Sequence, residues 1–489
     1  HWEIQGWMIL ILGWVFVPFY SRSMVYTMPE FLERRYNPQS RTILSVISLV
    51  SYVLTKVAVT VYAGGLVFQQ VFGIKELWGI DFFWIAAIGL VVLTALYTIF
   101  GGMKSVLYTS VLQTPILLLG SLIILVLGFK ELGGWDEMMR VCGAVTVNDY
   151  GDTMTNLIRS NDDANFPWLG ALIGSAIIGF WYWCTDQFIV QRVLSGKNEK
   201  EARRGTIFGA YLKLLPVFLF LIPGMIAFAL HQKYIGAGGE GFLPMLANGT
   251  ANADAAFPTL VAKLLPAGVK GLVVCGILAA LMSSLASLFN SSAMLFTIDF
   301  YKRFRPETPE KKLVGIGQIA TVVIVILGIL WIPIMRSVGD VLYTYLQDVQ
   351  SVLAPGIAAA FLLGICWKRT SAQGGMWGLI AGMIIGLTRL GAKVYYSNAG
   401  EVADSTFKYL FYDMNWLFFC GWMFLFCIIV VIVVSLATEA PTAEKIQGLV
   451  FGTATKEQKA ATRASWDHWD IIHTVIILAI TGAFYWYFW

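Results

Sequence analysis

The amino-acid sequence predicts an all-α polytopic membrane protein. Of its 489 residues, 57% are hydrophobic and only 13% are charged, whereas a soluble domain of ordinary composition has about 25% charged residues. The mean hydropathy is +0.70. Apolar runs of the length that crosses a bilayer also recur along the whole chain. Together these observations exclude an ordinary soluble globular domain.

Twelve apolar runs are long enough to be expected as membrane spans. They lie at residues 4–20, 42–72, 82–100, 107–129, 167–190, 205–230, 269–297, 313–335, 351–367, 374–392, 416–437 and 470–489. The stretch 438–469 is polar, and we expect it to be a cytoplasmic loop that precedes the last span.

Lysine and arginine gather in alternate loops, and the positive-inside rule places those loops in the cytoplasm. The loop residues are Arg22, Arg34, Arg35, Arg41, Lys104, Arg192, Lys197, Lys200, Arg203, Arg204, Lys302, Arg303, Arg305, Lys311, Lys312, Lys368, Arg369, Lys445, Lys456, Lys459 and Arg463. The net charge of +4 reflects this asymmetry, so no nucleic-acid partner is expected. Both chain ends come out external.

One stretch inside the run 167–190 combines three aromatic rings with a carboxylate and an amide, in the order Trp181-Tyr182-Trp183-Cys184-Thr185-Asp186-Gln187. A charge at membrane depth is costly unless it faces the interior of the helix bundle. Flat apolar rings beside polar groups predict a small polar solute bound within the membrane. The alternative is an aromatic belt at the interface, with Asp186 near the lipid headgroups.

Three further polar residues lie inside apolar runs. Lys56 is expected to be paired or to face the bundle interior. Lys213, close to Pro216, either faces the interior or extends its ammonium toward the cytoplasmic surface. Gln347 opens the span that Pro355 and Gly356 are expected to interrupt.

A cluster of hydroxyls on small residues is the second chemical signal. Ser283, Ser284 and Ser287 lie within one apolar run. Sodium is a hard cation that takes oxygen ligands, by analogy with calcium and magnesium. Two serine hydroxyls and a carbonyl oxygen of the preceding turn would supply half of a sodium shell. The alternative is close helix packing through small residues.

Several segments together resemble the sodium/solute symporter family, and within it the sodium/glucose cotransporter branch. They are Gly13–Pro18, Thr27–Tyr36, Tyr97–Ser105, Trp181–Arg192, Gly209–Pro216, Leu281–Ser292 and Tyr345–Leu362. The resemblance runs from about residue 3 to about residue 437. It implies two inverted five-helix repeats, as in the leucine-transporter class, with extra peripheral helices and with solute and ion near the midplane.

The resemblance also implies how the chain is divided. Residues 1–437 would form the transporter core, residues 438–469 a cytoplasmic loop, and residues 470–489 a C-terminal transmembrane helix. The first helix of the first repeat would precede His1, so we expect the core to be N-terminally incomplete.

Carried over by position, Tyr182, Trp183, Lys213 and Gln347 resemble sugar-contacting residues. Tyr182 also resembles the inner gate beneath the sugar. Tyr343 and His1 resemble outer-gate aromatics. Glu3 lies one residue beyond the position of the family's sugar-binding glutamate.

The carbonyl of Ala280 and the hydroxyls of Ser283 and Ser284 resemble half of the family's conserved sodium site. Relatives that carry two sodium ions resemble one another in a second site, which uses an aspartate and a threonine. This chain has Ser110 and Ala286 at those positions. We therefore expect one sodium ion per solute.

The resemblance implies a sodium-coupled symporter that imports a monosaccharide of the glucose or galactose type by alternating access. Such a protein is expected in the plasma membrane (the inner membrane if it is bacterial), as a monomer in the lipid bilayer, with sodium as coupling ion and no organic cofactor. Import of another polyol such as myo-inositol, or of another organic solute, remains an alternative, as does a solute sensor without flux. An enzyme is not expected, because no nucleophile–base arrangement is evident.

Overall fold

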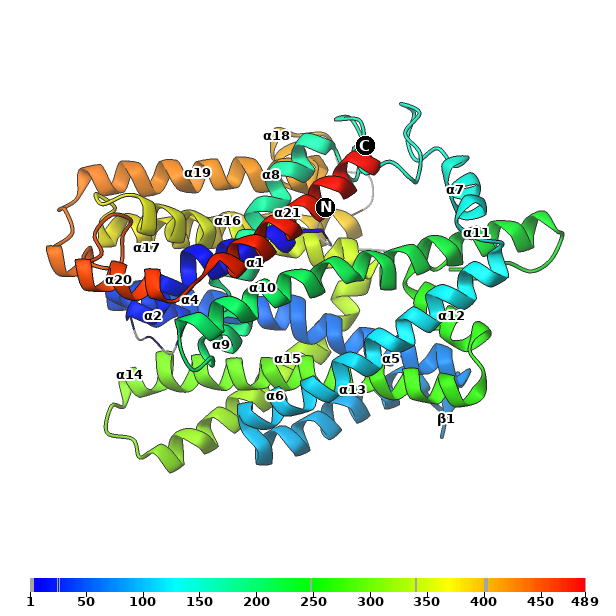
Figure 1. Ribbon diagram of the computed structural model, residues 1–489, viewed down its shortest axis with the longest axis horizontal. Helices are drawn as coiled ribbons and strands as arrows, with labels where there is room; N and C mark the ends of the chain where they lie inside the picture. The colour runs from blue at the N-terminus through cyan, green and yellow to red at the C-terminus, as the bar shows by residue number, and fades with distance from the viewer. Residues whose placement is uncertain are drawn as a thin grey trace.

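The computed structural model describes residues 4–23, 25, 27–246, 249–338, 341–399 and 403–488, and these are mostly helical (Figure 1). Side chains within the helices are described except at residues 97, 99–107, 109, 112 and 336–338. One short hairpin departs from the expected all-α class: β1 (Glu76–Leu77) pairs antiparallel with β2 (Ile80–Asp81). Its two turn residues, Trp78 and Gly79, have φ angles of 56° and 74°, as a tight two-residue hairpin requires.

The first half of the chain forms α1 (Gly6–Ile11), η1 (Leu12–Phe16), α2 (Val17–Ser23), α3 (Met28–Arg35), α4 (Pro38–Ser51), η2 (Tyr52–Val57), α5 (Ala58–Phe72), α6 (Phe82–Leu132), α7 (Trp135–Gly143), α8 (Trp168–Gly179), η3 (Phe180–Thr185), α9 (Gln187–Leu194), α10 (Glu199–Pro216), η4 (Val217–Leu221) and α11 (Ile222–Gly236).

The second half forms η5 (Ala253–Ala255), α12 (Ala256–Leu264), α13 (Ala267–Met294), η6 (Leu295–Tyr301), α14 (Lys302–Phe304), α15 (Glu310–Val338), α16 (Leu342–Cys366), α17 (Ala372–Asn398), α18 (Thr406–Lys408), η7 (Tyr409–Asp413), α19 (Trp416–Ala437), η8 (Ala443–Lys445), α20 (Lys456–Ala464) and α21 (His468–Tyr487).

The twelve expected spans all coincide with helical backbone, but their number is not confirmed. Among the described residues, ten helices are long and apolar enough to cross a membrane, or eleven if the bent pair Gly6–Ser23 and Met28–Arg35 counts as one. The runs 82–100 and 107–129 both lie in α6, whose backbone is helical from Phe82 to Leu132. Most side chains between the two runs lie outside the described residues, so the division into two spans stays a prediction.

The expected interruption of α16 at Pro355 and Gly356 is also wrong, because the helix is continuous from Leu342 to Cys366. Gly356 serves packing instead. A Cβ atom on Gly356 would stand 2.9 Å from the Cα atom of Gly382 in α17. A pair of glycines therefore lets the two helices approach closely, as small residues do in membranes.

Among the described residues the buried apolar side chains form four clusters, and the two largest are called the first and second cores here. The first core lies among α1, α2, α8, η3 and α19 and includes Met8, Phe16, Trp181, Ala358 and Leu417. The second core lies among η2, α5, α13 and α15 and includes Tyr52, Val57, Phe188, Leu288 and Val352. Figure 1 shows the matching arrangement, with α5, α6, α13 and α15 on one side and α8, α16, α17, α19 and α21 on the other. Helix α16 contributes to both cores.

The stretch 438–469, expected as a loop, contains η8 and α20 and packs onto the helices. The backbone N–H of Phe451 donates to the carbonyl oxygen of Ile365 at 2.9 Å. The ammonium of Lys445 donates to the carbonyl oxygen of Glu33, also at 2.9 Å. These bonds fix the stretch to the ends of α16 and α3.

The last helix, α21, lies beside α1 and α10 (Figure 1). The indole N–H of Trp14 donates to the hydroxyl of Thr474 at 2.9 Å, across 460 residues of sequence. The same indole meets Trp466 edge to face, with ring centroids 5.5 Å apart. The C-terminal helix is thus part of the folded body.

Candidate functional site

The site is built around a break in a membrane-spanning helix. Helix α8 ends at Gly179, and the next turn, η3, has π-helical spacing through Thr185. Asp186 then leaves the helix with an extended backbone, and its carboxylate accepts a hydrogen bond from the N–H of Phe188 to cap α9. Single π-helical turns are frequent at functional sites, because they redirect side chains.

The break presents an aromatic pair to a cation. Tyr182 and Trp183 are both partly buried and meet edge to face at 5.1 Å between ring centroids. The ammonium of Lys213, on α10, lies 5.7 Å from the centre of the Trp183 ring, within cation–π range. Lys213 therefore faces the aromatic pair, as the bundle-interior interpretation requires. Two ring faces and an N–H donor suit a ligand with both apolar faces and hydroxyl groups.

Gln347 lies on α16, which packs against η3. Its side chain is only 6% exposed. Its amide oxygen Oε1 is buried and accepts no hydrogen bond from any described residue. An unsatisfied buried acceptor costs about 1–3 kcal/mol, so a ligand hydroxyl that donated to Oε1 would recover that free energy.

Of the remaining predicted solute and gate residues, the structure describes Tyr343 alone. Tyr343 is 40% exposed at the start of α16. It lies four residues before Gln347, on the same face of the helix. His1 and Glu3 lie outside the described residues, so their expected roles stay predictions.

The predicted sodium ligands all lie on α13. Ser283 is buried, whereas Ala280 and Ser284 are partly exposed. The hydroxyl of Ser283 makes a 2.6 Å hydrogen bond with the hydroxyl of Ser110 on α6. In the described part of the chain no three His, Cys, Asp or Glu side chains gather at a metal-binding distance. Neutral oxygens are therefore what α13 offers to a hard cation.

Ser287, one turn further along α13, is engaged by a positive charge. Its hydroxyl accepts a hydrogen bond from the guanidinium of Arg192 on α9. The same hydroxyl donates to the carbonyl oxygen of Ser283 at 3.0 Å. The Ser287 hydroxyl is thus already engaged on both sides and is a poor ligand for a second sodium ion.

Lys56 is paired, as its position in an apolar run predicted. Its ammonium forms a buried ion pair with Asp186, and Asp186 also accepts a 2.8 Å hydrogen bond from the Tyr52 hydroxyl. Sequence reasoning missed Tyr52. A signal was present, because Tyr52 lies four residues before Lys56 and such residues share a helix face.

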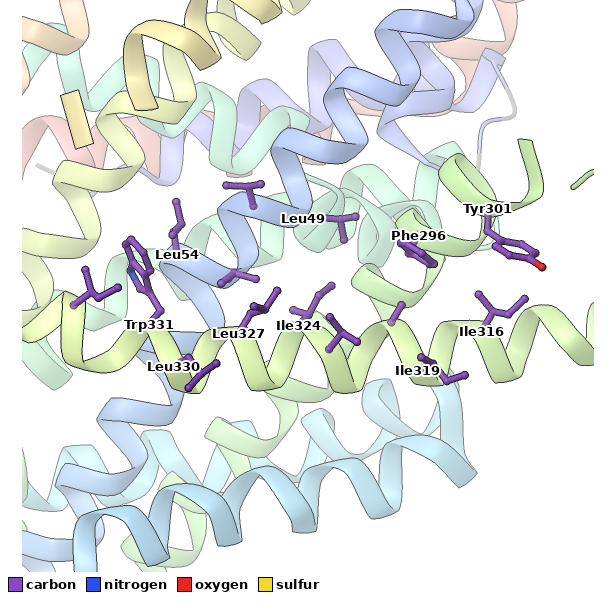
Figure 2. Close-up of a pocket in the computed structure, with 15 residues that line it drawn as sticks. Leu49, Leu54, Phe296, Tyr301, Ile316, Ile319, Ile324, Leu327, Leu330 and Trp331 are labelled. Carbon is purple, nitrogen blue, oxygen red and sulfur yellow. The ribbon is translucent and has the colours of Figure 1, made fainter. Parts of the chain in front are cut away.

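An apolar cavity of about 700 Å³ lies apart from these residues, between α4, η2, η6 and α15 (Figure 2). Its lining is aliphatic and aromatic, with Leu49, Leu54, Phe296, Ile324 and Trp331 among the side chains that point into it (Figure 2). No predicted solute or sodium residue lines it. A cavity with so few polar groups does not suit a polar solute.

The chain also matches a model of the sodium:solute symporter family over residues 3–382. The chain belongs to this family. Similar family members include the sodium/mannose cotransporter SLC5A10 of Bos taurus, which is 36% identical over 99% of this chain and 83% of its own length. The sodium/myo-inositol cotransporter 2 of Homo sapiens is 35% identical over 92% of this chain and 68% of its own. The sodium/glucose cotransporter 1 of Ovis aries is 37% identical over 88% and 67%.

The fold of this symporter is similar to that of a solved Na⁺-coupled sialic acid symporter in a substrate-bound outward-open state. The TM-score is 0.67 at 21% identity, over 90% of this chain and 84% of that one. The leucine-transporter-like class expected from the sequence is thereby confirmed. The symporter is a multi-pass protein of the plasma membrane, as its relatives and its apolar helices show.

Proposed function

We propose that this symporter imports a monosaccharide of the glucose or galactose type, driven by sodium. The observation that carries the proposal is the buried, unpartnered oxygen of Gln347 on α16. Helix α16 packs against η3, which holds Tyr182 and the Trp183 ring beside Lys213. A pyranose has apolar ring faces for the aromatic pair and hydroxyls for the amide and the ammonium. The similarity to cotransporters named for glucose and mannose supports the same substrate class.

Sodium binds first, at the Ala280 carbonyl and the Ser283 and Ser284 hydroxyls, and favours the outward-open state. The sugar then binds against Gln347 and Lys213, with Tyr182 beneath it as the inner gate. Coupling follows because each ligand raises the affinity for the other by the same factor. Tyr343 closes the outer side in this proposal, with His1 beside it and Glu3 as a further sugar contact.

We propose residues 1–437 as the transporter core, residues 438–469 as a cytoplasmic segment and residues 470–489 as a C-terminal membrane helix. The protein acts as a monomer in the lipid bilayer and needs no organic cofactor. It catalyses no chemical conversion of its solute.

Myo-inositol is the second candidate solute, because the human sodium/myo-inositol cotransporter 2 is as similar to this chain as the mannose and glucose cotransporters are. The ring hydroxyls of inositol would satisfy Gln347 and Lys213 in the same way. A sensor would bind either solute without net flux.

The decisive experiment is uptake of labelled glucose, galactose, mannose and myo-inositol into proteoliposomes, with and without an inward sodium gradient. We expect the hexoses to accumulate only with the gradient and to be recovered chemically unchanged. Accumulation of myo-inositol alone would favour the second candidate. Sodium-dependent binding without accumulation of any solute would indicate a sensor and would contradict the proposal.

A further inference from the structure

Lys56 lies where the two cores meet. Its ammonium stands 4.8 Å from the centre of the Tyr52 ring and 4.4 Å from that of Phe188, and both rings belong to the second core. The same ammonium stands 5.9 Å from the Trp181 ring and 4.9 Å from the Tyr182 ring, which belong to or pack on the first core. Two rings from each core therefore surround one cation, at distances typical of cation–π contact.

Asp186 completes this junction from the other side. Its carboxylate pairs with Lys56, accepts the Tyr52 hydroxyl at 2.8 Å and caps α9 through the N–H of Phe188 at 3.1 Å. The side chains of Lys56 and Asp186 are only 7% and 2% exposed. Because each charge alone would be strongly destabilising at such depth, neither side chain can leave the other without a new partner or water.

We propose that the Lys56–Asp186 ion pair is a release latch between the two helix groups, and the inference rests on the proposed transport function. Element η2 packs with α13 and α15, whereas η3 packs with α8 and α1, and both elements pack against α16. When the latch is closed, Asp186 holds the break after η3, and Lys56 holds the Tyr182 ring under the solute. Release to the cytoplasm requires η3 to move away from η2, and the ion pair opens with that movement.

The test neutralises the pair without leaving a lone charge, in the variant Lys56→Met/Asp186→Asn. Asparagine keeps an oxygen for the α9 cap and for the Tyr52 hydroxyl, so the ion pair and the ammonium contacts of Lys56 are removed while these two hydrogen bonds remain. The matched control is Lys393→Met/Asp348→Asn. It removes another largely buried ion pair of this chain, which joins α16 to α17 with side chains 18% and 13% exposed.

The readout is labelling of Cys184 by N-ethylmaleimide in sodium-containing proteoliposomes, followed by peptide mass spectrometry. Cys184 lies on η3 beside the gate and is fully buried, as are Cys420 and Cys427 on α19. We expect the latch variant to label at Cys184 at least about fivefold faster than the unaltered protein. Labelling of Cys420 and Cys427 should not change, and the control variant should behave like the unaltered protein.

Unchanged labelling of Cys184 in the latch variant would overturn the proposal. Equal acceleration at Cys420 and Cys427, or in the control variant, would overturn it as well, because general loosening would then explain the result. The labelling needs no solute, so it tests the latch separately from the proposed function. If the unaltered protein showed no sodium-driven uptake, that result would contradict the proposed function and not the latch. Efflux of preloaded solute should accelerate in parallel with the labelling.

Discussion

At the scale of single residues, the proposed solute site consists of polar groups held by buried surroundings. Gln347 is fixed in α16 with an unpartnered oxygen, and Lys213 is fixed beside the Trp183 ring. Side chains that are already in place lose little conformational entropy when a ligand binds. A solute hydroxyl therefore gains most of the free energy of each hydrogen bond.

We expect Gln347→Ala to weaken solute binding by roughly 5- to 150-fold, which corresponds to losing about 1–3 kcal/mol at a buried hydrogen-bonding group. Equilibrium binding of the labelled solute at saturating sodium is the measurement. Sodium binding without solute serves as the control and should stay near normal. A comparable loss of both would show that the substitution disturbs the fold rather than the solute contact.

The sodium ligands can be tested in the same way. Ser283→Ala together with Ser284→Ala removes two proposed oxygen ligands, so the sodium concentration for half-maximal uptake should rise about tenfold or more. Ser291→Ala is a matched control on α13, since the hydroxyl of Ser291 accepts from Gln191 at 2.5 Å. Sodium dependence that is identical in the double variant and the control would rule out the serine pair.

At the scale of elements, sequence patterns located the helices better than the features inside them. The apolar runs fall on helical backbone, because bilayer thickness fixes the length of a spanning helix, although the number of spans is not confirmed. They did not reveal the π-helical turn at η3, since that spacing depends on Asp186 leaving the helix to pair with Lys56 from a distant segment. Pro355 suggested an interruption that is absent, because proline is tolerated inside membrane helices and α16 continues through it.

The same limit applies to the candidate site. The sequence was enough to select Tyr182, Trp183, Lys213 and Gln347 as candidates, because polar groups are rare in apolar runs. Their partners were not, because contacts such as that between Ser110 and Ser283 join helices 173 residues apart. Only folding brings such pairs together.

The start of α16 gives a prediction about pH. Both carboxylate oxygens of Asp254 accept from the N–H of Leu342 at 3.1 Å and so cap the helix. Burial raises the pKa of Asp254 above its ordinary value, although the hydrogen bond from Leu342 opposes the shift. A carboxyl whose pKa is raised by folding contributes stability that is fully present below its unfolded pKa and is lost as pH rises through the folded pKa.

We therefore expect Asp254→Asn, which keeps an oxygen for Leu342, to remove this loss of stability between the ordinary pKa of 3.8 and the raised folded value. Asp254→Ala should be about 1 kcal/mol less stable than Asp254→Asn at every pH, because the cap itself is lost. Thermal unfolding of the detergent-solubilised protein from pH 4 to pH 7 measures both. Parallel pH profiles for the unaltered protein and Asp254→Asn would contradict the assignment.

At the scale of the whole molecule, the number of coupling ions sets the driving force. Ser110 and Ala286 offer no negative charge to a second sodium ion, and Arg192 already occupies Ser287. We expect one sodium ion per solute. A tenfold sodium gradient contributes about 1.4 kcal/mol, and 100 mV adds about 2.3 kcal/mol per charge. One ion then supports roughly a few-hundred-fold accumulation of solute, and two ions roughly the square of that.

The voltage at which coupled flux in proteoliposomes reverses, at fixed gradients, gives the stoichiometry directly. Ser110→Asp with Ala286→Thr should move the reversal voltage toward the two-ion value. A reversal voltage in the unaltered protein that fits two charges per solute, or a sodium Hill coefficient near two, would refute the prediction.

The contact between Trp14 and Thr474 has a consequence for how a ribosome makes this protein. The two residues are 460 positions apart. At about 5–20 residues per second, Thr474 is synthesised roughly 20 to 90 s after Trp14. For that interval Trp14, which lies in η1, lacks this hydrogen-bond partner, although it has already left the ribosome. The insertion machinery or a transient lipid contact must therefore shield its polar indole N–H until translation is nearly complete.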